Sequence, residues 1–128
     1  MSCSACTEVQ CHGMSENYMY ETVYDEILDE NITRKTDTYN NWIKYFPTYQ
    51  LKDKDDLNID WTKGINVFLK FDCIDSVDVQ NMSKSAIDEI ITRCYHEDDR
   101  IVEKIVTERN KTVNSFKEGK IYICIKNI

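Results

Sequence analysis

A chain of 128 residues with a net charge of −7 has the size of one globular domain. Hydrophobic residues make up 41% of it and charged residues 30%, a balance that excludes disorder of the whole chain. The acidic excess argues against nonspecific DNA binding, which depends on Lys and Arg side chains that neutralise phosphates.

The residue types point to a source and a compartment. Ile, Lys, Asn, Tyr and Phe, which have A/T-rich codons, total 49 residues, against 10 for Ala, Gly, Pro and Arg. This bias indicates an A/T-rich genome, such as that of a large DNA virus or an intracellular parasite. We find no apolar run that could span a bilayer and no signal sequence, so we expect no membrane association and a cytoplasmic or nuclear location rather than secretion. In such a compartment the six cysteines are expected to be reduced thiols or metal ligands rather than disulfides.

The N-terminal segment, residues 1–14, is rich in potential metal ligands and has no apolar period. These ligands are Cys3, Cys6, Cys11 and His12. The CxxC spacing of the first two allows both thiolates to reach one zinc ion, which makes zinc the one cofactor that the sequence indicates. The alternative is an N-terminal tail with free thiols, because a second CxxC is missing. In either case we expect this segment to lie outside a single domain formed by residues 15–128.

Two helices are predicted at the start of that domain. Residues 16–31, with Ser15 as the cap, carry apolar side chains at the spacing of one helix face. These side chains are Tyr20, Val23, Tyr24, Ile27 and Leu28. A second, shorter helix is predicted from a cap at Asp37 or Thr38 to Phe46, because Pro47 disfavours helical geometry in the residue before it.

Alternating apolar and polar residues predict two strands, one at residues 65–73 and one at residues 120–127. We expect these two strands to pair. Residues 48–61 between the second helix and the first strand predict a weak hairpin around a charged turn.

The remaining stretch, residues 85–117, keeps a helical period throughout. One straight helix of that length would be about 50 Å long, which exceeds a compact domain of this size. We therefore expect a third helix that begins near Ser83 or Ser85, a break at residues 96–99, and a fourth helix that ends before Gly119. Because helices and strands are grouped rather than alternating, the fold class is α+β, a small, mainly antiparallel sheet covered on one face by about four helices.

No catalytic signature stands out, so we expect a non-enzymatic protein-binding or regulatory module. It would dock on a protein or a ribonucleoprotein assembly, such as a host or ribosomal complex, through the acidic, aromatic-rich first helix and the cysteine-rich N-terminal arm. The candidate partner-binding residues are Tyr18, Glu21, Asp25, Asp29 and Tyr45. Aromatic side chains dominate protein interfaces, and an acidic face suits a basic partner.

The alternative function is that of a small thiol- or zinc-dependent enzyme. It would combine the cysteines at positions 3, 6 and 11 with Cys94 and His96. Residues at positions i and i+2 of a helix face away from each other, which argues against a direct Cys–His pair. The sequence specifies no oligomeric state, and we take a monomer as the starting assumption.

Overall fold

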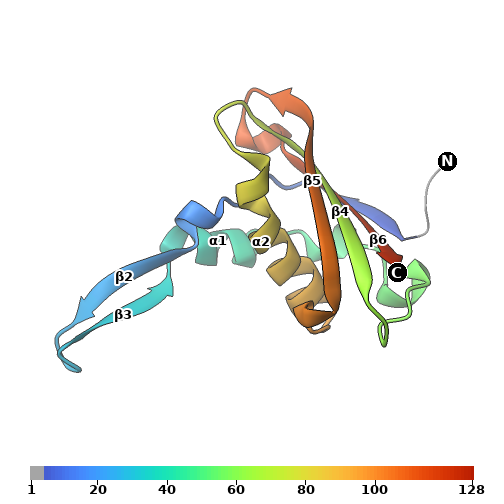
Figure 1. Ribbon diagram of the computed structural model, residues 1–128. Coiled ribbons are helices and arrows are strands. Elements are labelled where there is room, and N and C mark those ends of the chain that lie inside the picture. The colour runs from blue at the N-terminus through green and yellow to red at the C-terminus, as the bar shows by residue number, and fades with distance from the viewer. Residues whose placement is uncertain (1–4) are drawn as a thin grey trace.

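The computed structural model describes residues 5–128 as an α+β domain with a four-stranded sheet and a separate two-stranded hairpin (Figure 1). The strands are β1 (Cys6–Val9), β2 (Tyr20–Asp25), β3 (Glu30–Lys35), β4 (Ile65–Ile74), β5 (Val102–Val113) and β6 (Lys120–Asn127). The helices are α1 (Asp37–Tyr45) and α2 (Ser83–Ile87), which continues as a π-helical segment, Asp88–Cys94. The fold class is as predicted, but the prediction of about four helices is wrong, because the described chain has two α-helices and several short 3-10 turns.

The large sheet has the strand order β1-β6-β4-β5. β4 and β6 are antiparallel neighbours, which confirms that the two clearest alternating segments pair. β5 runs parallel to β4, because the chain crosses between them through α2 and its π-helical continuation. The sheet is therefore mixed.

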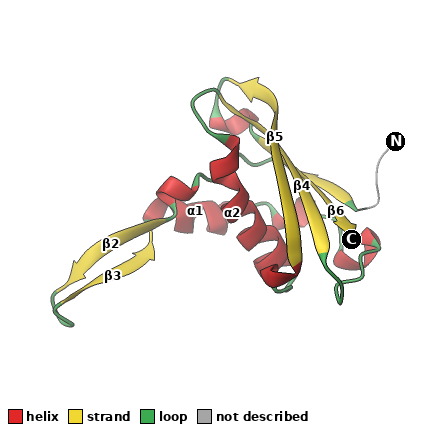
Figure 2. Ribbon diagram, viewed as in Figure 1, coloured by secondary structure: helices red, strands yellow, loops and turns green. Residues whose placement is uncertain are grey.

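The core lies between one face of this sheet and α2 (Figure 2). Alternate residues of β4 and β6 point to this face and are almost completely buried, namely Ile65, Val67, Leu69, Phe71, Ile121, Ile123 and Ile125. They pack with Met82, Ala86, Ile90 and Ile91 from the helical side. Burial of apolar area contributes roughly 25 cal/mol per Å², so this layer is the main source of stability.

The predicted first helix is wrong: residues 20–35 form the β2–β3 hairpin. The helical spacing of its apolar residues is real, but Thr22, Val23 and Tyr24 favour extended backbone. Asp29 has a φ of 52°, in the left-handed region, and such a residue turns the chain instead of extending a helix. The second predicted helix is confirmed as α1, but its cap is Thr36 rather than the predicted Asp37 or Thr38.

The predicted fourth helix is also wrong, because residues 102–113 form β5. Val102, Ile105 and Val106 have helical spacing, yet β-branched side chains pack well in a strand. The break predicted at residues 96–99 is confirmed: the helical segment ends at Cys94, and His96 has a φ of 57°. The weak hairpin at residues 48–61 is wrong as well, since Thr48–Gln50 and Lys54–Leu57 form 3-10 turns.

The prediction of a separate N-terminal tail is corrected for the described residues. β1 pairs antiparallel with β6 as the short edge strand of the sheet, and Val9 is buried in the core. Thr7 and Val9 face inward while Cys6 and Glu8 face outward, the alternation of a strand with one buried face.

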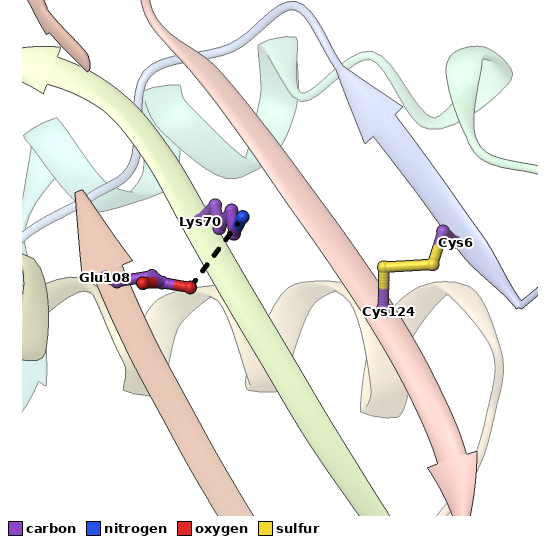
Figure 3. The surroundings of a disulfide bond; sticks show 4 residues. All are labelled: Cys6, Lys70, Glu108 and Cys124. Carbon is purple, nitrogen blue, oxygen red and sulfur yellow. Dashed lines mark ion pairs between the residues drawn. A yellow bond between two sulfur atoms is a disulfide. The ribbon is translucent and has the colours of Figure 1, made fainter. Parts of the chain in front are cut away.

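A disulfide joins Cys6 to Cys124 on the outer face of the sheet (Figure 3). The two residues lie directly opposite each other in β1 and β6, with 4.0 Å between their Cα atoms. The prediction that all six cysteines are reduced thiols or metal ligands is therefore wrong for this pair. Disulfides persist in oxidising environments, so the cystine argues against a reducing compartment, and the cytoplasmic or nuclear location stays a prediction.

Candidate docking surface

The β2–β3 hairpin projects away from the rest of the domain (Figures 1 and 2), and we call residues 20–35 the arm. Its strands pair in register from Tyr20 opposite Lys35 to Asp25 opposite Glu30. Six residues per strand give the arm a reach of about 20 Å. Neither strand contains a buried residue, so the arm does not contribute to the core.

The base of the arm is fixed to the domain. Met19, the residue before β2, is completely buried. The backbone N–H of Thr36 donates to the carbonyl oxygen of Met19 at 3.0 Å, and the Thr36 hydroxyl donates to the Tyr18 carbonyl. The ring of Tyr20 contacts that of Tyr39 on α1 edge-on, with 5.9 Å between centroids. The arm therefore leaves the domain in a defined direction.

The tip of the arm is a structured turn. The carboxylate of Asp25 accepts hydrogen bonds from the backbone N–H groups of Ile27 at 2.9 Å and Leu28 at 3.1 Å. The hydroxyl of Tyr24 donates to the carboxylate of Asp29, and this hydrogen bond raises the pKa of Tyr24 above its usual value. These contacts hold the tip in one conformation, which lowers the entropy that a partner must overcome on binding.

The tip combines exposed apolar surface with negative charge. Ile27 is 94% exposed and Leu28 60% exposed, although such residues are usually buried. They stand between two pairs of acidic residues, Asp25 with Glu26 and Asp29 with Glu30. Such a surface is complementary to an apolar pocket with a basic rim.

The structure brings most of the predicted partner-binding residues to the arm. Glu21, Asp25 and Asp29 lie on it, and Glu21 pairs with Arg34 across the two strands at 3.0 Å. Tyr18 lies at its base and is 65% exposed. Tyr45 is 73% exposed but lies at the far end of α1, away from the others.

Sequence reasoning missed the two apolar residues of the tip. Ile27 and Leu28 fit the apolar face of the predicted helix, so the sequence pattern does not mark them as exposed. The available signal was local: the six residues 25–30 place two apolar side chains between two acidic pairs, which is unusual for a core segment.

The predicted zinc ligands do not assemble in the described part of the chain. Cys6 is bonded to Cys124, and Cys3 lies outside the described residues. The Nε2 atom of His12 accepts from the backbone N–H of Ile74 at 3.2 Å, so its Nδ1 carries the proton and donates to the carbonyl oxygen of Gly13 at 2.7 Å. No group of three or more His, Cys, Asp or Glu residues within 5–128 is arranged to hold a metal ion.

The two remaining candidate ligands are engaged within the domain. Burial lowers the pKa of His12 and keeps the imidazole neutral, with both ring nitrogens engaged inside the domain. Burial also raises the pKa of the neighbouring Cys11 thiol to about 11, which disfavours the thiolate that a metal requires.

Cys94, another residue of the enzyme alternative, lies in an environment that disfavours its thiolate. Burial and the nearby Glu89 carboxylate raise the pKa of the Cys94 thiol to about 11, and its Sγ lies 3.9 Å from Glu89 Oε1. Reactive cysteines need the opposite environment, one that favours the thiolate. The Glu89 carboxylate is itself buried and accepts from Nε of Arg93 at 2.7 and 2.8 Å. Glu89 and Arg93 therefore form a structural ion pair.

Within residues 5–128, none of the helices has the length and apolar character needed to cross a membrane. The chain matches no protein-family model, and no curated protein resembles it significantly in sequence.

Proposed function

We propose that this protein is a non-enzymatic docking module that binds a protein or ribonucleoprotein assembly through the β2–β3 arm. The observation that carries the proposal is the tip, where Ile27 and Leu28 are exposed on a structured turn that adds nothing to the core. A protein gains no stability from holding two large apolar side chains in water at the end of a projection. A partner that covers these side chains removes their apolar surface from water, which favours binding.

The chemistry of the arm defines the partner. An apolar pair at the centre of a contact is suited to fill a pocket, and surrounding charges govern the approach and the orientation. Four carboxylates around the tip require basic residues at the rim of that pocket. A viral or parasite regulator that acts on a host or ribosomal complex fits both this requirement and the A/T-rich residue usage.

The docking role rests on the arm rather than on the cysteine-bearing segment. Residues 6–9 are committed to the sheet, and Cys6 is committed to a disulfide. Tyr18, exposed at the base of the arm, extends the proposed surface toward the domain. Tyr45 lies outside it.

Replacement of the tip side chains tests the proposal. The Ile27→Ser/Leu28→Ser double variant is expected to lose recovery of the partner by more than about tenfold, because it removes the apolar anchor. Both side chains are exposed, so the variant should retain the wild-type fold. The measurement is quantitative mass spectrometry of proteins captured by the tagged chain from the source cell or its host.

The matched control is Tyr49→Ser, which removes an 84% exposed aromatic side chain from a 3-10 turn outside the arm. It should leave recovery unchanged. A cyclised peptide of residues 19–36 should compete with the full chain for the same partner. Equal recovery by wild type and the tip variant, with no competition by the peptide, would show that the arm is not the docking surface.

A further inference from the structure

β5 is the long edge strand of the four-stranded sheet. It has 12 residues and lies at the end of the strand order, so its side opposite β4 is unpaired among the described strands. Ile105 at its middle is 44% exposed. An unpaired edge of this length is a template for another strand, and proteins usually protect such edges with charged side chains.

The register assigns the charged side chains of β5 to two faces. Lys104, Val106 and Glu108 lie beside Asn66, Phe68 and Lys70 of β4, on the outer face that also carries the disulfide (Figure 3). Glu108 lies 3.8 Å from Lys70 on that face. The alternate residues Ile105, Thr107 and Arg109 point to the helical side, whereas Glu103 is unpaired at a register shift next to Lys104.

These charges are arranged antisymmetrically about Val106. Lys104 precedes Val106 by two residues and Glu108 follows it by two, so opposite charges stand at equal distances on one face. Along the sequence, Glu103 also precedes Val106 by three residues and Arg109 follows it by three. Charges that only protect an edge strand from pairing can have any sign. They need not be opposite at positions equally distant from Val106.

This arrangement is self-complementary for antiparallel pairing. When two copies of β5 run in opposite directions with Val106 opposite Val106, Lys104 of each copy faces Glu108 of the other. Ile105 faces Thr107 in the same way. Within residues 5–128 Lys104 takes part in no ion pair, so its ammonium is available to a second copy.

The pair of Glu103 and Arg109 contributes less. The guanidinium of Arg109 already donates to the carbonyl oxygens of Cys73 and Ile74 at 3.0 Å and of Val77 at 2.6 Å. Glu103 of a second copy would meet a group whose donors are largely occupied. The outer-face pair of Lys104 and Glu108 is therefore the determinant of register.

The edge also borders an open space. A hollow of about 530 Å³ is lined by Ile105, Val106 and Thr107 together with Glu16, Gln80, Asn81 and Ser83. We propose that two copies of this protein associate through antiparallel pairing of their β5 strands about Val106, which joins the two four-stranded sheets into one.

Charge reversal tests this pairing. Lys104→Glu places like charges opposite each other twice per dimer, and Glu108→Lys does the same with the other sign. Each variant is expected to weaken self-association by roughly tenfold or more. An equimolar mixture of the two variants should restore the dimer, because each cross-strand position then pairs opposite charges. Sedimentation velocity of wild type, each variant and the mixture measures this.

The mixture also controls for folding, since a misfolded variant would not be rescued by its complement. Lys44→Glu on α1, an equal charge change at an exposed position outside the sheet, should associate like wild type. Val106→Cys should form a disulfide-linked dimer on mild oxidation, whereas wild type should not. A wild-type monomer at millimolar concentration, or a dimer that both charge reversals leave intact, would overturn the proposal.

Discussion

β4 and the arm are both built from paired strands, yet they serve opposite purposes. In β4, the residues at positions 65, 67, 69, 71 and 73 are at most 1% exposed, and the strand has neighbours on both sides. In the arm, each strand has one partner and no residue is buried. Strand pairing therefore supplies stability where helices cover one face of the sheet. In the arm, which no helix covers, it supplies an accessible surface.

A matched pair of substitutions tests this contrast most strongly. Ile123→Ala in β6 should lower the free energy of unfolding by about 4 kcal/mol, because Ile123 is 1% exposed and its removal leaves a cavity in the core. Ile32→Ala in β3 should cost less than about 1 kcal/mol, because the side chain is only half-buried and lies opposite Val23 of the partner strand. Urea denaturation followed by circular dichroism gives both values.

The two variants serve as controls for each other, since they make the same chemical change in strands of different burial. Similar losses at the two positions would contradict the contrast. Such a result would show that the arm is part of the cooperative core.

The disulfide tests the sheet side of this contrast, because it links the edge strand β1 to β6. Its two cysteines are separated by 118 residues, so the bond constrains almost the whole unfolded chain. Reduction should lower the free energy of unfolding by about 3 kcal/mol. The measurement is the urea midpoint with and without a reductant.

The control for reduction is the Cys6→Ser/Cys124→Ser double variant, whose midpoint should not respond to the reductant. The three described free cysteines, Cys11, Cys73 and Cys94, are present in both proteins. An unchanged wild-type midpoint after complete reduction would refute a stabilising role for the bond.

The parts of the fold that could be predicted are those in which local pattern and burial agree. Residues 65–73 and 120–127 alternate strictly because one face is covered, and both were identified as strands. Residues 38–46 were identified as a helix because Pro47 and the aromatic spacing agree. The arm and β5 were predicted as helices because β-branched and aromatic residues at positions i, i+3 and i+4 also fit a helix. In an exposed hairpin or an edge strand, burial does not enforce the period of two that distinguishes a strand.

The disulfide and the docking surface depend on distant parts of the chain. Cys6 and Cys124 become neighbours only through the pairing of β1 with β6, which no local signal near either cysteine indicates. The acidic candidates Glu21, Asp25 and Asp29 were found because charge is visible in the sequence. Ile27 and Leu28 were not found, because the exposure of an apolar residue depends on the fold.

Removal of the whole arm is expected to have the smallest effect on stability. Met19 and Thr36 are joined by a backbone hydrogen bond of 3.0 Å, so residues 20–35 can be replaced by a two-residue Asn-Gly turn between them. The shortened protein loses the contacts of Tyr20 and Lys35 with Tyr39, which should cost less than about 1 kcal/mol. Urea denaturation and the amide resonances of β4 and β6 measure the outcome. An unfolded product would show that the arm supports the domain, whereas a folded product that no longer recovers a partner separates stability from recognition.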